Sequence, residues 1–291
     1  MIARAVRRTL MFVLAIVLVA CAWELYKLVG PQDGGSVLGM EILPRANDRA
    51  MPHTWDMVTR LFEDESTAAT SRPMWLAVTQ YAWYSFRLAL GGLVLGTVIG
   101  VGLATAMARL RIVERGLLPW VIVSQTVPLI ALAPQVVSWS GRIEVFGWEW
   151  PSWASVSVLA AFLSFFPIAV GTLRGLRAAP AASLELMDSY AASWWQTWWR
   201  LRMPAAVPYM VPALKLGATA SVIGVIVSEI SIGRPGGIGN AVTSFASART
   251  GDPTKIFSAI FGSAALGLAL YGLIVSLEVI VMRRRPAEQV A

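Results

Sequence analysis

Long apolar stretches alternate with short charged segments along this chain. A helix that crosses a hydrocarbon layer of about 30 Å needs about 20 apolar residues. Four stretches contain no charged residue over that length: residues 88–108, 116–141, 150–173 and 256–277. A fifth stretch, residues 207–228, contains only Lys215, whose aliphatic stem lets its ammonium group reach the headgroups from near the end of a span. The pattern therefore predicts five membrane spans in the body of the chain.

The first apolar run, residues 10–23, is shorter and allows two interpretations. A basic N-terminal segment and a lipoprotein-like cleavage motif are typical of a signal peptide, in which the lone Cys21 would be acylated. These features are Arg4, Arg7 and Arg8, and the tetrapeptide from Leu18 to Cys21. Alternatively, the run continues through Glu24 and Lys27, which are three residues apart and are expected to pair on one helix face. The favoured prediction is this longer, uncleaved helix over residues 1–29.

The composition of the chain supports a membrane protein. It is 56% hydrophobic and 14% charged, with 13 Trp, whereas soluble domains have about 25% charged residues. Its mean hydropathy is +0.63. The sequence therefore predicts an all-α polytopic membrane protein with about six transmembrane helices.

Basic residues indicate the orientation of these six spans. Since cytoplasmic loops carry the excess of Lys and Arg, the segments dense in arginine are predicted to be cytoplasmic, together with both termini. Those arginines are Arg4, Arg7, Arg8, Arg109, Arg111, Arg115, Arg174, Arg177, Arg200, Arg202, Arg283, Arg284 and Arg285. The opposite loops carry diluted basic residues, namely Arg45, Arg49, Arg60, Arg72, Arg142, Arg234, Arg249 and Lys255. The net charge of +7 is thus explained by topology and anionic lipid, without nucleic acid.

Residues 30–74 are predicted to form an extracytoplasmic loop between the first two spans. Helix-like spacing of Trp55, Val58, Leu61 and Phe62 predicts an amphipathic helix on the outer surface. The only histidine, His53, precedes it without a Cys or carboxylate cluster, so a metal site is not expected. We expect a solvated or interfacial histidine there.

Prolines and glycines interrupt the predicted spans. Helix breaks at membrane depth expose carbonyl groups that protein or a water-filled cavity must satisfy, so Pro128 and Pro134 are candidates for a transport pathway, although ordinary kinks explain such prolines equally well. The other prolines within spans are Pro119, Pro167, Pro208 and Pro212. Small residues at spacing of four, in the run from Gly91 to Gly102, predict close helix packing.

A charged, tryptophan-rich segment between Glu185 and Pro204 reads ELMDSYAASWWQTWWRLRMP. Its spacing resembles the cytoplasmic signature of permease subunits of binding-protein-dependent ABC importers. Glu185 and Pro204 match that pattern, and Leu201 and Met203 are apolar substitutes. Ala191 stands where the pattern has glycine. The second and third positions, Leu186 and Met187, also depart from it.

Three further runs resemble the nitrate, sulfonate, taurine and thiamine-precursor branch of these permeases. The first is Ser85 to Gly91, together with GLLPW at residues 116–120. The second is QTVPLIALAP from Gln125 to Pro134, and the third is VSEISIGRPGGIGN from Val227 to Asn240. The resemblance covers roughly residues 75–285, with a cytoplasmic tail at 286–291. It implies a transmembrane subunit that pairs with a second permease copy or paralogue, cytoplasmic ATPases and an extracytoplasmic solute-binding protein.

The coupling segment, residues 181–204, is predicted to dock on those ATPases. Ser183 or Ala182 would cap a short helix in which Leu184, Met187 and Ala191 share a face. An interfacial role on the membrane is the alternative, because Trp194, Trp195, Trp198 and Trp199 suit an aromatic belt. By resemblance, the residues expected to couple to the ATPases are Glu185, Met187, Asp188, Ala191, Leu201 and Pro204.

Glu229 is a carboxylate near the end of an apolar span, which is costly unless it is paired, hydrated or functional. It is either a group near an outer gate or, as favoured, a structural acid paired with Arg87 or Arg234. The candidate pathway residues are Pro128, Pro134, Glu229, Gly236 and Gly237. Gly236 and Gly237 belong to GRPGGIGN, which is predicted to be an extracytoplasmic turn.

The sequence contains no GxxxxGK[ST] phosphate loop, so the chain itself is not expected to hold a cofactor or to be an enzyme. ATP and Mg²⁺ are expected on the partner ATPases. An ion-coupled secondary transporter would usually show intramembrane ionisable groups and an internal repeat, and neither is evident. A membrane enzyme would need convergent catalytic groups, which are also missing from the sequence. The motif QTVPLIALAP slightly favours a thiamine precursor, but the sequence leaves the substrate open.

Overall fold

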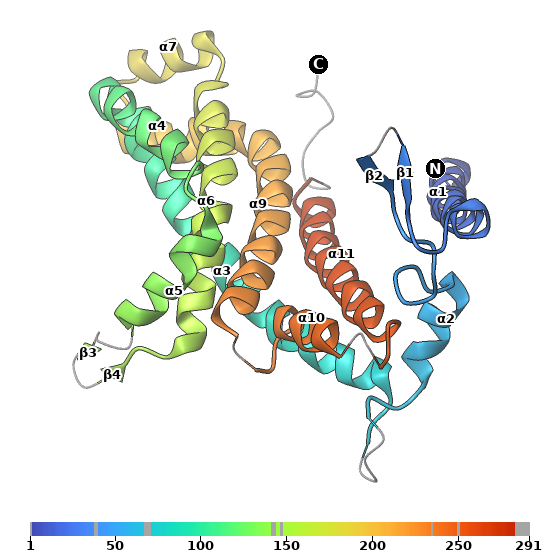
Figure 1. Cartoon of the computed structure of the whole chain (residues 1–291). Coiled ribbons are helices and arrows are strands. Elements are labelled where there is room, and N and C mark those ends of the chain that lie inside the picture. Colours follow the sequence, from blue (N-terminus) through green and yellow to red (C-terminus); the bar gives the residue numbers. More distant parts are fainter. Residues whose placement is uncertain are drawn as a thin grey trace. The chain divides into compact units, whose positions relative to one another are not determined.

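The computed structural model describes residues 2–37, 40–66, 71–140, 144–145, 148–233, 235–248 and 251–282. The chain forms two compact units: one comprises Met1–Thr79 and Ala241–Phe261, and the other comprises Gln80–Asn240 and Gly262–Ala291. Helices dominate the described residues (Figure 1), which confirms the predicted all-α class. The predicted tail 286–291 lies outside the described residues, as do Arg142, Arg234, Arg249 and Arg283 to Arg285 of the orientation argument.

Five helices in the described part of the chain are long and apolar enough to cross a membrane, and a bent helix pair makes six if it counts as one span. The five are α1 (Ile2–Val29), α3 (Met74–Arg109), α6 (Ser152–Arg177), the stretch Trp194–Ile232 that ends in α9 (Met203–Ile232), and α11 (Lys255–Met282). Four of the five predicted apolar stretches in the body of the chain fall on α3, α6, α9 and α11, and the fifth, residues 116–141, falls on the bent pair. The helix α1 extends to Val29, as the longer interpretation of the N-terminal run requires.

The predicted stretch 116–141 is not one straight helix. It divides into α4 (Arg111–Ser124) and α5 (Leu129–Ser140), which are bent by 101°. The break ends at Pro128, whose ring removes a backbone donor and disfavours helical geometry at the preceding residue. Pro119 and Pro134 lie inside α4 and α5 without ending them.

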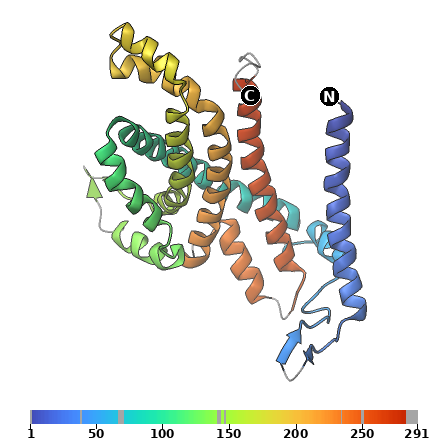
Figure 2. The same cartoon turned by 90° about the horizontal axis from the view of Figure 1, so that it is seen from above.

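Within the second unit, α6 packs along α9, and both views show the two helices side by side (Figures 1 and 2). Small residues also bring α3 close to α6. A Cβ atom on Gly92 would lie only 2.4 Å from the Cβ atom of Ala160. This confirms that the spaced glycines of α3 serve close helix packing.

The predicted outer loop has more structure than its sequence pattern indicates. It contains an antiparallel pair, β1 (Gly35–Val37) and β2 (Met40–Leu43), which we did not predict. The predicted helix is present as α2 (Thr54–Thr59) followed by η1 (Arg60–Phe62). Trp55, Val58 and Phe62 are exposed, whereas Met57 is buried. A second small pair, β3 (Glu144–Val145) and β4 (Trp148–Glu149), follows α5.

Polar contacts hold this loop against α1, and they correct one prediction. Glu24 and Lys27 do not pair with each other. Glu24 accepts hydrogen bonds from the backbone N–H of Thr54 at 2.6 Å and from its hydroxyl at 2.8 Å, and Lys27 pairs with Asp48 at 2.7 Å. Both α1 side chains therefore bind a segment distant in sequence, which the local i,i+3 rule does not consider. The hydrogen bond and the charge of the lysine lower the pKa of Asp48.

His53 is partly buried rather than solvated. Its Nδ1 atom lies 2.8 Å from a carboxylate oxygen of Glu24, and its ring stacks on Trp55 with 4.2 Å between centroids. Within the same unit, the Nε atom of Arg60 donates to Asp252 at 2.7 Å. Partial burial raises the pKa of Asp252, but hydrogen bonds from Thr254 and this arginine prevail and lower it.

Candidate functional site

The coupling segment begins with α7 (Ala181–Ser189), which projects beyond the end of α6 (Figure 1). The helix starts earlier than we predicted: its N-cap is Pro180, and neither Ala182 nor Ser183 caps it. Pro180 provides no capping side chain, but its carbonyl accepts the N–H of Leu184 at 3.1 Å and closes the first turn.

No residue of α7 is buried within the described structure. Leu186 and Tyr190 are 55% and 76% exposed, and the carboxylates of Glu185 and Asp188 are exposed beside them. Met187 is half-buried. An acidic helix with uncovered large apolar side chains is typical of a surface that another protein covers.

A Schellman turn ends α7. The N–H of Ala191 donates to the carbonyl of Asp188 at 2.9 Å, and the N–H of Ala192 donates to that of Met187 at 3.0 Å. Ala191 has φ +49°, and among the described residues it is the one non-glycine residue with positive φ. Its position corresponds to the glycine of the motif, and the turn needs the left-handed backbone that glycine adopts most easily. Ala191 is exposed and does not continue the helix face of Leu184 and Met187, contrary to our prediction.

The chain then enters α8 (Trp194–Thr197) through a capping box. The hydroxyl of Ser193 accepts the N–H of Gln196 at 3.3 Å, and the side-chain carbonyl of Gln196 accepts the N–H of Ser193 at 2.7 Å. We missed this helix start, although the spacing Ser-x-x-Gln is its sequence signature. Two well-defined turns therefore fix the linker between α7 and α8.

A tryptophan anchors the second half of the segment. The π-helix η2 (Trp198–Arg202) joins α8 to α9 without a break, and Trp198 is only 6% exposed. It packs in a core cluster with Ala104, Met107, Leu173, Leu176 and Ala206. The burial of Trp198 excludes it from the aromatic belt that we considered, whereas Trp195 and Trp199 are exposed.

The remaining motif residues lie at the junction of η2 and α9. Leu201 is half-buried in η2, and Pro204 is exposed in the first turn of α9. Thus the structure places Glu185 and Asp188 on an exposed helix and Leu201 and Pro204 at the entry to a span. The Schellman turn and the Trp198 cluster connect these two parts.

A buried carboxylate lies near the other end of α9. Glu229 is 1% exposed, and it accepts the hydroxyl of Ser85 at 2.8 Å and the N–H of Gly239 at 2.9 Å. The Ser85 oxygen in turn accepts the N–H of Ile238 at 2.9 Å. This Glu229 cluster ties α3, α9 and the start of α10 (Ile238–Ser247). We did not predict Ser85, because no local pattern links residues 144 positions apart.

Arg87, one of the two basic partners that we predicted for Glu229, does not bind it. Arg87 is exposed, and its guanidinium lies 5.9 Å from the ring centroid of Trp83. Arg234 lies outside the described residues. In the described structure the carboxylate therefore accepts hydrogen bonds from a hydroxyl and a backbone N–H, and not from Arg87.

The other candidate pathway residues are only partly gathered at this cluster. Gly237 is buried against Glu229, and a Cβ atom there would lie 2.1 Å from the carboxylate. Gly236 is exposed with φ +105°. Pro128 and Pro134 are both exposed on the bent pair. The described residues contain no group of three His, Cys, Asp or Glu side chains that could hold a metal.

Comparisons with known proteins identify the family of the chain. The family described as "Binding-protein-dependent transport system inner membrane component" matches residues 92–284. A formylaminopyrimidine transport permease protein of Halalkalibacterium halodurans is 33% identical over 66% of this chain and 72% of its own length. A riboflavin transport system permease protein of Chloroflexus aurantiacus is 28% identical over 75% of this chain and 79% of its own.

A solved structure shares the fold. The crystal structure of an amino acid ABC transporter with histidines matches 72% of this chain and 94% of its own with a TM-score of 0.52, at 16% sequence identity. The family match, the two related permeases and the helical fold lead to one conclusion. The chain belongs to the family of inner membrane components of binding-protein-dependent transport systems.

Proposed function

We propose that this chain forms the translocation pathway of an ATP-driven importer and couples to cytoplasmic ATPases through the coupling segment. It would pair with a second permease copy or paralogue and receive its solute from an extracytoplasmic binding protein. The observation that carries the proposal is α7, an acidic helix without a buried residue that well-defined turns hold at the end of a membrane-spanning unit. ATP and Mg²⁺ bind the partner subunits in this proposal.

The architecture of the segment suits force transmission. Its exposed half offers Glu185, Asp188, Leu186 and Tyr190 to a partner. Its other half contains Trp198, which is buried between helices of the unit. Replacing a buried tryptophan by alanine costs about 3–5 kcal/mol, so this anchor resists separation from the core. Movement of a docked ATPase would therefore reach α9 without a flexible connection.

A nitrogen heterocycle is the proposed solute class. The two related permeases are named for formylaminopyrimidine and riboflavin, which share this chemistry. The QTVPLIALAP run, which slightly favours a thiamine precursor, points to the same class. Calorimetry of the cognate binding protein with a pyrimidine, a flavin and an aliphatic sulfonate is the direct test. Preference for the sulfonate would refute this substrate class.

Reversing the charge of Glu185 tests the coupling role. In Glu185→Lys the exposed helix presents the wrong sign to an ATPase, and we expect co-purification of the ATPase and ATP-driven uptake to fall while membrane insertion is unchanged. Glu63→Lys is the matched control, because it reverses an exposed acid in the predicted outer loop. Unchanged ATPase co-purification and uptake in Glu185→Lys would show that the segment is only an interfacial helix.

The same reconstituted vesicles test the alternative of an ion-coupled secondary transporter. Uptake by the unaltered complex should require ATP and survive collapse of ion gradients. Uptake that persists without ATP would favour the secondary transporter and refute the proposed mechanism.

Cysteine labelling tests the proposed orientation, with both termini cytoplasmic in a bacterial inner membrane. In a Cys21→Ser background, Asp56→Cys should react with an impermeant thiol reagent in intact cells, whereas Ile112→Cys should not. Both positions are exposed in the structure, so accessibility within the fold does not bias the comparison. The reverse labelling would overturn the orientation.

A further inference from the structure

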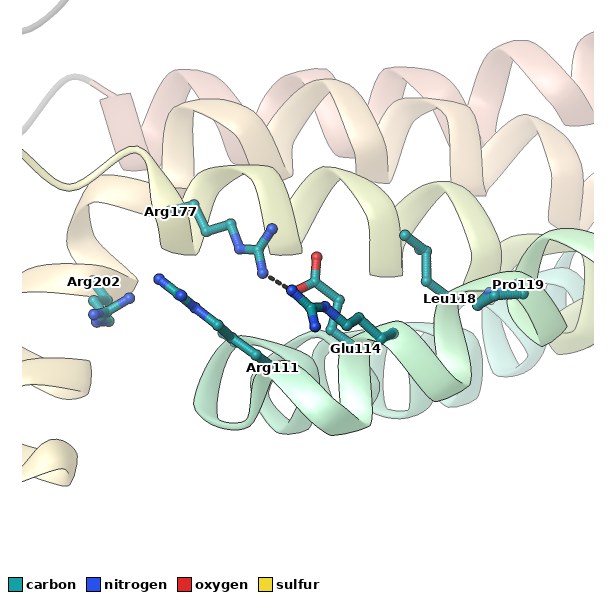
Figure 3. Close-up of a pocket in the computed structure, with 8 residues that line it drawn as sticks. Arg111, Glu114, Leu118, Pro119, Arg177 and Arg202 are labelled. Atoms are coloured by element: carbon teal, nitrogen blue, oxygen red, sulfur yellow. Dashed lines mark hydrogen bonds and ion pairs between the residues drawn. The ribbon is translucent and has the colours of Figure 1, made fainter.

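A basic pocket of about 740 Å³ lies where α4 begins and α6 ends. We call it the arginine pocket. Its lining residues are Ala108, Arg111, Glu114, Arg115, Leu118, Pro119, Arg177 and Arg202. Figure 3 shows Arg111, Arg177 and Arg202 around a common space, with Glu114 beside them. Three helical segments far apart in sequence thus contribute arginines to one site.

The charges of this pocket are not balanced by its own residues. Four arginines and one glutamate line it, which leaves three positive charges. The carboxylate of Glu114 is already paired with Arg177, as the dashed line in Figure 3 marks. Within the described part of the chain, no acidic side chain forms an ion pair with Arg111, Arg115 or Arg202. Like charges gathered this closely repel one another, so an anion in the pocket would be stabilised.

Arg202 provides a second, independent observation. Its Nη1 atom donates to the carbonyl of Leu176 at 3.3 Å, which fixes the guanidinium at the pocket. Its Nε atom is buried and has no hydrogen-bond acceptor in the described structure. A buried donor without an acceptor costs about 1–3 kcal/mol. An oxygen-rich ligand that reached this atom would remove that cost.

The chemistry of the pocket favours phosphate over carboxylate. A guanidinium presents a planar fork of donors that matches carboxylate and phosphate oxygens alike, so the charge of the anion decides between them. A carboxylate brings one negative charge, whereas a phosphate monoester carries about 1.5–2. We infer that the arginine pocket binds a phosphate-bearing anion with at least two negative charges. Such a group could come from a lipid headgroup or from a soluble phosphorylated compound.

The position of the pocket gives the bound anion a role. Arg177 is in the last turn of α6, just before α7, and Arg202 ends η2, so the two arginines bracket most of the coupling segment. Arg111 and Arg115 add the start of α4. An anion that binds these arginines together would hold the two ends of the coupling segment close to the start of α4. This role, and the cytoplasmic location of the pocket, rest on the proposed function.

Thermal unfolding of the permease–ATPase complex in phosphatidylcholine nanodiscs tests the inference. One arm adds pyrophosphate to the solution, and the other includes cardiolipin, a lipid with two phosphates, in the nanodisc. A ligand that binds only the folded complex raises its unfolding temperature. We expect Arg111→Gln and Arg202→Gln each to weaken the binding about tenfold, because each removes a charged hydrogen-bond donor.

Arg174→Gln is the matched control. Arg174 is also an exposed arginine in the last turn of α6, but it does not line the pocket. It should retain the full response to either probe. Arg111 is exposed and forms no ion pair or side-chain hydrogen bond within the described residues, so its variant remains informative if Arg202→Gln fails to fold.

Stabilisation by pyrophosphate that depends on Arg111 would support a soluble ligand, and stabilisation by cardiolipin alone would support a lipid headgroup. The inference is overturned if neither probe stabilises the complex, or if Arg174→Gln loses the response equally. It is also overturned if Arg111→Gln releases the ATPase while the probes have no effect, because the pocket would then be a subunit interface. ATP-driven uptake by the unaltered complex reports separately on the proposed function.

Discussion

Replacing Ala191 with glycine should stabilise the turn that ends α7. With φ +49°, Ala191 occupies the left-handed region, where a residue with a Cβ atom is disfavoured by about 1–2 kcal/mol. Glycine has more conformational freedom in the unfolded chain, which offsets about 0.4–1 kcal/mol of this gain. The net stabilisation is on the order of 1 kcal/mol, which corresponds to about a fivefold change in the local opening equilibrium.

Hydrogen exchange measures this change where it occurs. The amides of Ala191 and Ala192 donate the two hydrogen bonds of the turn, so peptides that cover them report its opening. In Ala191→Gly these amides should exchange about fivefold more slowly, and ATPase binding should be kept or strengthened. In contrast to Ala191, Ala192 has no positive φ, so Ala192→Gly is the matched control and should leave exchange unchanged or make it faster. Faster exchange in both variants would refute the left-handed turn.

Three further predictions concern the buried cluster and the outer loop. Ser85→Ala removes one of the donors to the Glu229 carboxylate and leaves the N–H of Ile238 without its acceptor, so it should lower the free energy of unfolding by about 1–3 kcal/mol, measured by denaturation. Glu229→Gln keeps an acceptor and should cost less, so an equal loss would contradict this hydrogen-bond scheme. Gly237→Ala should lower the free energy of unfolding by about 1–3 kcal/mol through overpacking. The control Gly267→Ala, with open space around its Cβ position, should be neutral or slightly stabilising. Similar effects of both substitutions would contradict the packing argument. The pKa of Asp252 is lower in the folded protein than its ordinary value of about 3.9. Its ion pair therefore stabilises the fold fully above a pH of about 3.9, and this stabilisation is lost as the pH falls through the lowered pKa of the folded state. Asp252→Asn should therefore lower the unfolding temperature by a margin that shrinks toward zero in acid, and a margin independent of pH would refute the assignment.

The spans were predictable because they depend on local composition. A run of about 20 apolar residues satisfies the bilayer whatever the rest of the chain does. The bend between α4 and α5 was harder to predict, because residues 116–141 are apolar throughout and prolines also occur inside continuous helices. Pro134 lies within α5, for example, whereas Pro128 ends the break. Sequence alone did not distinguish the two.

Long-range polar contacts were not predictable. Glu24 appeared to have a local partner three residues away but instead binds Thr54. Glu229 is bonded to Ser85, a serine without a distinguishing pattern. In each case the choice of partner depends on which helices pack together, and a single sequence does not specify it. The motif position of Ala191 was more informative, because its glycine in the resembled family implies a backbone geometry that any residue there must adopt.

Continuity of the helical path from Trp194 to Ile232 has a mechanical consequence. Glu229 lies 35 residues after Trp194 along this path, and at 1.5 Å per residue the distance is about 50 Å. If the path acts as a lever that pivots near its tryptophan end, a tilt of about 5° displaces the carboxylate by roughly 4 Å. That displacement exceeds the length of every hydrogen bond in the Glu229 cluster. A small rotation near Trp194 would therefore be enough to break the hydrogen bonds of the buried Glu229 carboxylate.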